Sequence, residues 1–183
     1  EAIMNSEQKN LVLSVVNNKP HRAGKITDEE FLKLFPCTQG NVEDFIDDIL
    51  KNAHFSKDLK EVEYALYIGF HFGFTSKHED ILIHLLDDDF HYKHDDVVRA
   101  LIKIKAKSDN AVNVLYKCAL SEYDYLADDR EDGNYTLAWN CIYALVKIGS
   151  NYAIDKLKAL SKNPISEIKK KAVQVGKSYG VLD

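Results

Sequence analysis

Residues 141–149 read Cys141-Ile-Tyr-Ala-Leu-Val-Lys-Ile-Gly149. Small and apolar residues recur in this stretch at positions i, i+3, i+4 and i+7, which together form one face of an α-helix. The stretch Val97-Val-Arg-Ala-Leu-Ile-Lys-Ile104 keeps the same positions. The two stretches therefore predict two equivalent helices.

Two further stretches share a related pattern. Ala65-Leu-Tyr-Ile-Gly-Phe-His-Phe-Gly73 and Ala172-Val-Gln-Val-Gly-Lys-Ser-Tyr-Gly180 both have alanine, a β-branched residue, glycine, an aromatic residue and glycine at matching places. The four stretches begin 32, 44 and 31 residues apart. The middle interval is longer than the others by about a dozen residues, as an insertion into one repeat would make it.

A second helix is predicted before each of these four, with short polar or Gly/Pro turns between them. These preceding helices are expected over residues 42–52, 78–86, 110–120 and 152–160. The sequence thus predicts an all-α fold, an α-α superhelix of about four helical hairpins in residues 41–183.

Residues 1–40 predict an N-terminal helical cap on this superhelix, because the end of a repeat array needs a polar covering element. One helix is expected over residues 6–17. Another begins at Thr27, whose spacing from Glu30 is that of a capping box, and Pro36 supplies its stop. We expect residues 1–183 to form a single domain.

Composition narrows the class of partner. The chain has 29 acidic and 24 basic residues, a net charge of -5, and only three of the basic residues are arginines. This balance argues against nucleic acid and favours a basic protein as the partner. No apolar stretch reaches the roughly 20 residues that a membrane-spanning helix needs, so no membrane partner is expected either.

The three cysteines are Cys37, Cys118 and Cys141. They are odd in number and far apart, and the last two lie in apolar helical patterns, where a free thiol behaves as a small hydrophobic residue. The first residues of the chain carry neither a basic region nor an apolar region of an export signal. We therefore expect a reduced, cytoplasmic protein, and a monomer.

The stretch from Cys141 to Ala172 resembles HEAT repeats of the short, phycobilisome-lyase-like kind. This resemblance rests on a sequence motif: Ala144-Leu, Ile148-Gly, Ala153-Ile and then proline at position 164. It is good over residues 137–180, fair over 77–120 and weak before residue 60. The resemblance implies a HEAT-like solenoid that binds proteins along a curved surface. Members of such families include bilin lyases, peptide scaffolds, DNA-alkylation glycosylases and bacterial immunity proteins.

The acidic insertion, residues 122–133, is the first candidate for a binding surface. It carries six acids against one arginine, alternating in part with aromatic residues. Acids would steer and pair with a cationic protein, and tyrosines would add contact area. The expected binding residues are Glu122, Tyr123, Asp124, Tyr125, Asp128, Asp129, Glu131 and Asp132. The alternative is a loop that is merely solvated.

Tyr135, Trp139 and Tyr143 form a second candidate surface, because they share one face of the helix expected over residues 135–148. An exposed ridge of this kind would suit an interface, where tyrosine and tryptophan are enriched. The helix is apolar nearly all round, however. The alternative is that both faces are buried between neighbouring helices.

Histidines 84, 91 and 94 lie close in sequence to Asp87–Asp89 and Asp95–Asp96, so we also considered a metal site. The spacing of His91 and His94 matches no ligand motif, and this stretch is typical of a turn between helices. Asp95 or Asp96 is more simply interpreted as a helix N-cap. The sequence also lacks a nucleophile elbow and a phosphate-binding glycine loop, so neither a catalytic residue nor a cofactor is expected.

These observations favour a non-enzymatic protein-binding module, similar to an immunity protein that neutralises a cationic partner such as a toxin domain. A general HEAT adaptor or scaffold is the alternative within the binding class. A HEAT-type enzyme, either a bilin lyase or a DNA-repair glycosylase, is the alternative from another class. The glycosylase would need a basic groove, which the three lysines at 169–171 do not make alone.

Overall fold

The computed structural model describes residues 4–16, 24–35 and 41–183. Every regular element among them is a helix, which confirms the predicted all-α class. Asn17, Pro36 and Cys37, on which predictions above depend, lie outside the described residues. No helix in the described ranges has the length and hydropathy to cross a bilayer.

The chain divides into two compact units, Glu1–Ile81 and Leu82–Asp183, and each is considered by itself. The predicted single domain stays a prediction. The first unit contains α1 (Ser6–Val15), α2 (Asp28–Leu34), α3 (Val42–Ser56), α4 (Leu59–Phe72) and a short 3-10 helix, η1 (Ser76–His78). Within it α3 packs on α4, and α1 packs on both α2 and α4.

Capping fixes where the first helices begin. The Thr27 hydroxyl accepts the backbone N–H of Glu30 at 3.1 Å, and the Glu30 carboxylate accepts that of Thr27 at 3.0 Å. The predicted capping box is therefore confirmed. Asn5 and Gln8 make the same reciprocal pair at the start of α1. Each box satisfies backbone donors that an α-helix leaves unpaired at its N-terminus.

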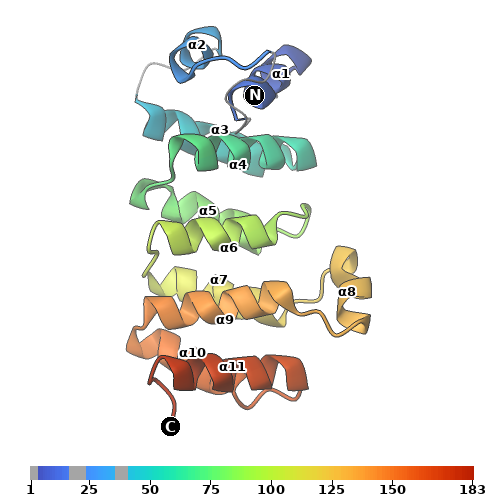
Figure 1. Ribbon diagram of the computed structural model, residues 1–183, viewed down its shortest axis with the longest axis vertical. Coiled ribbons are helices and arrows are strands. Elements are labelled where there is room, and N and C mark those ends of the chain that lie inside the picture. Colours follow the sequence, from blue (N-terminus) through green and yellow to red (C-terminus); the bar gives the residue numbers. More distant parts are fainter. Residues whose placement is uncertain (1–3, 17–23, 36–40) are drawn as a thin grey trace. The chain divides into compact units, whose positions relative to one another are not determined.

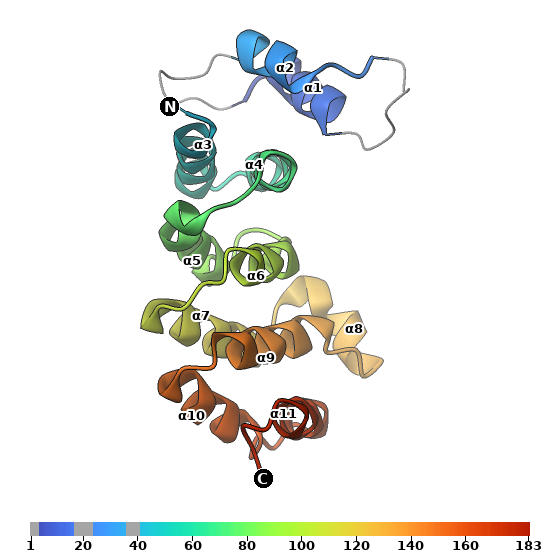
Figure 2. The same cartoon turned by 60° about the vertical axis from the view of Figure 1, so that its left-hand side comes forward.

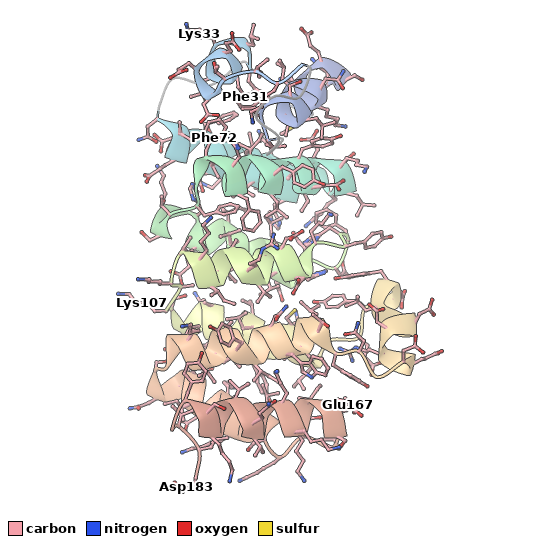
Figure 3. The ribbon with its side chains drawn as sticks, in the orientation of Figure 1. Phe31, Lys33, Phe72, Lys107, Glu167 and Asp183 are labelled. Carbon is pink, nitrogen blue, oxygen red and sulfur yellow. The ribbon has the colours of Figure 1, made fainter. Side chains whose placement is uncertain are left out.

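Aromatic rings fill the core of the first unit. The ring of Phe31 lies 5.2 Å from that of Phe35 and 5.6 Å from that of Phe72, measured between centroids. Figure 3 shows Phe31 and Phe72 next to each other between α2 and α4. Phe45 of α3 completes the cluster at 5.2 Å from Phe35. Contacts of this kind attach α2 to the α3–α4 hairpin.

The second unit begins within α5 (Glu79–Asp87). It continues with α6 (His94–Lys103), α7 (Asp109–Leu120), η2 (Asp124–Leu126), α8 (Ala127–Glu131), α9 (Thr136–Ile148), α10 (Asn151–Leu160) and α11 (Ser166–Ser178). Figure 2 shows α6, α9 and α11 in one layer, with α7 and α10 in a second. Helix α9 is central, because it packs against α6, α7, α10 and α11.

The sequence of α9 explains this central place. Seven of its thirteen residues are buried, and they occupy more than one side of the helix: Leu137, Ala138, Cys141, Ile142, Ala144, Leu145 and Val146. A helix that is apolar nearly all round is stable only when other elements cover it. Gly149, with φ of +64°, ends α9 in the left-handed conformation that favours glycine at a C-cap.

Residues 122–133, predicted as an insertion that breaks the helical period, contain the short helices η2 and α8. Figure 1 shows α8 projecting to one side of the layer that contains α9. The segment leaves α7 and returns to the N-terminal end of α9. It therefore adds short helical turns of its own between the two helices of a hairpin.

Candidate functional site: an acidic segment on an aromatic anchor

We call residues 122–133 the acidic segment. All six of its carboxylate side chains belong to residues exposed to solvent: Glu122, Asp124, Asp128, Asp129, Glu131 and Asp132. Its tyrosines, Tyr123 and Tyr125, are only partly exposed. The segment thus has a charged outer side and an aromatic inner side.

Tyr123 and Tyr125 both pack on His94, the first residue of α6. The ring of Tyr123 is stacked on the imidazole, with centroids 4.0 Å apart and planes tilted by 25°. The ring of Tyr125 lies 5.8 Å from the same imidazole at 14°. His94 itself is completely buried. The two tyrosines therefore attach the acidic segment to α6.

Hydrogen bonds identify the proton on His94. Its Nε2 lies 2.6 Å from the backbone carbonyl oxygen of Asp88, which can only accept, so Nε2 carries the proton and donates. Its Nδ1 lies 2.7 Å from the Tyr125 hydroxyl and accepts from it. Burial lowers the pKa of His94 to about 4. The imidazole is therefore neutral at pH 7, which this hydrogen-bond pattern requires.

His91 extends the stack. Its ring lies 4.4 Å from that of His94 at 17°, and its Nε2 lies 2.7 Å from the carbonyl oxygen of Leu85. We call His91, His94, Tyr123 and Tyr125 the aromatic anchor. Burial raises the pKa of both Tyr123 and Tyr125, so both hydroxyls keep their protons at pH 7.

Arg130, the only basic residue of the acidic segment, also turns back onto the fold. Its Nη2 donates to the carbonyl oxygen of Ser121 at 2.5 Å, at the end of α7. Its guanidinium lies 5.1 Å from the ring centroid of Tyr135, a cation–π contact. The outer side of the segment therefore presents carboxylates without a competing cation of its own.

The prediction that Asp95 or Asp96 is an N-cap is wrong. Helix α6 begins at His94, and its N-cap residue, Lys93, makes no side-chain capping bond. Both aspartates lie in the first turn, where a negative charge interacts favourably with the helix dipole. The Asp95 carboxylate also accepts a hydrogen bond from Asn140 at 2.6 Å, a contact across to α9.

Two of the histidines considered as metal ligands, His91 and His94, serve hydrogen bonding in this structure. The nitrogens of His94 bond to Tyr125 and to a backbone carbonyl, as described above. His91 accepts the backbone N–H of Lys93 at 3.0 Å through its Nδ1. Among the described residues, no group of three or more His, Cys, Asp and Glu side chains is arranged to hold a metal ion.

The predicted aromatic surface, Tyr135, Trp139 and Tyr143, is half-buried at all three positions. The indole N–H of Trp139 donates to the carbonyl oxygen of Glu167 at 3.3 Å, and the Lys171 ammonium lies 5.6 Å from its ring. Trp139 therefore joins α9 to the start of α11. The three aromatic side chains thus form neither a fully exposed ridge nor part of a fully buried core.

Tyr143 lies farther along α9, away from the acidic segment. Its ring meets that of Tyr179 at 6.1 Å, and the Lys147 ammonium lies 5.5 Å from it. Tyr135, by contrast, is in contact with Arg130. The structure thus brings Tyr135 to the acidic segment, whereas Trp139 and Tyr143 contact the C-terminal helix region.

The two described cysteines, Cys118 and Cys141, are free thiols buried between α7 and α9. The Tyr123 hydroxyl lies 3.7 Å from the Cys118 sulfur. Burial raises the pKa of the Cys141 thiol well above its usual range. A thiol in this protonated, buried state is a poor nucleophile.

Sequence reasoning missed the aromatic anchor. His91 and His94 were interpreted only as possible metal ligands, and Tyr123 and Tyr125 were predicted to contact the partner. Acidic residues and tyrosines alternate over residues 122–125. This pattern could have predicted that the tyrosines face the fold and the acids face solvent. Searches against protein-family models, curated proteins and solved structures found no match for this chain.

Proposed function

We propose that this protein is a non-enzymatic binding module of the immunity type, which binds and neutralises a cationic protein such as a toxin domain. The acidic segment is the proposed contact surface. A basic patch on the partner would pair with its carboxylates, and Tyr135, Trp139 and Tyr143 would extend the contact along α9. A general adaptor is the alternative within the same class.

One observation carries this proposal: the carboxylates face solvent while the segment's aromatic and basic side chains hold it to the fold. A flexible acidic loop would lose conformational entropy on binding. Anchoring by Tyr123, Tyr125 and Arg130 removes part of that cost in advance. Such pre-organisation is unnecessary for a loop whose role is solvation alone.

We also propose that the helical hairpins belong to a HEAT-like solenoid, and that the protein acts in the cytoplasm as a monomer. The recurrence of equivalent helices in the sequence supports the solenoid, as does the packing of α7, α9, α10 and α11 on one another. The buried free thiols are compatible with a reducing compartment.

A catalytic role receives less support. His94 is neutral, and both of its ring nitrogens already have hydrogen-bond partners. Cys118 and Cys141 are buried thiols. A general base or a nucleophile needs access to its substrate, and these groups lack it.

The test begins with a partner co-purified from native cells and identified by mass spectrometry. Its affinity is then measured for the wild type and for a variant in which four carboxylates become amides: Asp128→Asn, Asp129→Asn, Glu131→Gln and Asp132→Asn. We expect this variant to keep its stability and to bind at least tenfold more weakly. Each rim charge pair contributes a few tenths to about 1 kcal/mol, and four act together.

A matched control removes four other exposed carboxylates, so that net charge changes equally: Glu7→Gln, Glu29→Gln, Asp109→Asn and Asp155→Asn. This control should bind like the wild type. Equal weakening by the two variants would mean that only net charge matters. Unchanged affinity of the first variant would reject the acidic segment as the binding surface.

A further inference from the structure

A cavity of about 520 Å³ opens at the opposite end of α9 from the acidic segment. Its floor consists of core residues, among them Leu101 of α6, Leu115 of α7 and Ala144 of α9, all of which are buried. Ile102 and Ile148 form half-buried walls. Cavities of this size accommodate small molecules, and an apolar floor favours an apolar part of a ligand.

Among the described residues, the charged ones that line this cavity are three exposed lysines, Lys105, Lys107 and Lys147. Figure 3 shows Lys107 projecting from the ribbon on the side away from α8. None of the acidic residues that the structure describes lines the cavity, and the Lys147 ammonium lies 5.5 and 5.9 Å from the ring centroids of Tyr143 and Tyr179. Apolar surface surrounded by ammonium groups is complementary to a molecule that has an apolar body and a negative charge.

The dipole of α6 favours a positive charge just after its C-terminus, but the backbone conformation at position 105 favours glycine rather than lysine. Lys105 has a φ of +55° and follows the end of α6, where its N–H bonds to Ile102 and the next N–H bonds to Leu101. This is the hydrogen-bond pattern of a Schellman motif, in which glycine is the favoured residue. A lysine here must adopt the left-handed conformation at some cost in free energy.

The helix dipoles likewise do not account for all three lysines. Lys147 lies in the last turn of α9, where a positive charge is favourable. Lys107, however, precedes Ser108, the N-cap of α7, where the dipole disfavours a positive charge. Lys105 and Lys107 thus occupy positions at which backbone conformation or helix electrostatics favours another residue.

We propose that this lysine-rimmed cavity binds an aliphatic carboxylate, with the chain on the apolar floor and the carboxylate paired with the ammonium groups of Lys105 and Lys107. The proposal is independent of the proposed function, because it concerns a separate surface and an anionic ligand. It adds a small-molecule site at the end of α9 opposite the acidic segment.

The probe is decanoate, compared with decanol and decyltrimethylammonium, which share its chain length but are neutral and cationic. Calorimetry gives the affinities, and amide chemical shifts of residues 101–107 and 144–148 locate the site. We expect decanoate to bind at least tenfold more tightly than decanol and to shift these amides. Equal binding of decanoate and decanol, no binding, or shifts confined to other residues would overturn the proposal.

The variant Lys105→Gly removes one ammonium and provides the residue that the backbone favours. With Lys107→Gln added, we expect decanoate binding to weaken about tenfold while decanol binding stays unchanged. Lys57→Gly is the matched control, since Lys57 also has a left-handed φ, of 54°, and ends α3 in the first unit. The preference for decanoate must survive in this control and be lost in the double variant.

Discussion

Opposite charges lie near the two ends of α9, and different kinds of contact hold them in place. At its N-terminal end, the acidic segment is attached by side chains: stacked rings, a histidine–tyrosine hydrogen bond and Arg130. At its C-terminal end, Lys147 lies in the last turn of α9, and Lys105 and Lys107 lie in the short connection between α6 and α7. The two groups of charges are therefore held in place differently. Side-chain contacts position the carboxylates, whereas helix ends and a short loop position the lysines.

This difference has an energetic consequence. The acidic segment is held in place by a buried neutral histidine and two tyrosines, so its conformation should respond to pH and to the loss of one ring. The lysine end depends on backbone hydrogen bonds, so substitution of its side chains should change stability little. The three predictions below test that contrast, from the largest expected effect to the smallest.

Acidification should lower the free energy of unfolding, and this is the largest expected effect. His94 has a pKa of about 4 in the fold, against 6.5 for an ordinary histidine. Between these pH values the unfolded chain binds more protons, so stability falls as the pH is lowered. By a pH of about 4 the loss attributable to His94 reaches about 3 kcal/mol.

Urea unfolding at pH 7, 5.5 and 4 measures this effect. The variant His94→Gln is the comparison, because it keeps the other acids and bases but lacks the imidazole. The wild type should lose more stability than the variant between pH 6.5 and 4. Parallel pH profiles for the two proteins would show that His94 titrates as an ordinary histidine, and the buried anchor would be wrong.

Removing one ring of the anchor should have the next largest effect. Tyr123→Ala loses the stack on His94 and the contact with Cys118, which should cost about 2 kcal/mol. Amide hydrogen exchange across residues 122–133 should speed up at the same time. Tyr123→Phe keeps the ring and should stay within about 0.5 kcal/mol of the wild type. Similar stabilities for Tyr123→Ala and wild type would mean that the segment does not depend on this ring.

The smallest effect is expected at the lysine end. Lys105→Gly removes the cost of a lysine in the left-handed conformation, but glycine also raises the conformational entropy of the unfolded chain. The free energy of unfolding should therefore rise by only about 0.5 kcal/mol. Thermal unfolding of this variant beside Lys57→Gly measures it. A loss of more than about 1 kcal/mol would indicate that the Lys105 side chain supports the fold.

Much of the fold could be predicted from the sequence because helical periodicity is a local property. The repeat of small and apolar residues at i, i+3, i+4 and i+7 predicted α9 through Ile148, and α9 ends there. Thr27 and Glu30 predicted the start of α2 for the same reason, since a capping box spans only one turn. The predicted N-cap of α6 was wrong by two or three residues, because Asp95 and Asp96 suit a first turn as well as a cap.

The candidate site was less predictable because its contacts are not local. The acidity of residues 122–133 is visible in the sequence, but the partner of Tyr123 is His94, which lies on another helix. Asn140 and Asp95 are likewise 45 residues apart in sequence. No periodic pattern pairs such positions, so the aromatic anchor emerges only from tertiary structure.

The central claim is that the fixed carboxylates of the acidic segment attract a cationic partner. The most direct measurement is the association rate constant of the protein with its co-purified partner as salt is raised. We predict a rate that falls steeply with ionic strength in the wild type, and a nearly flat dependence when Asp128, Asp129, Glu131 and Asp132 are amides. A rate in the wild type that does not depend on salt would contradict the account.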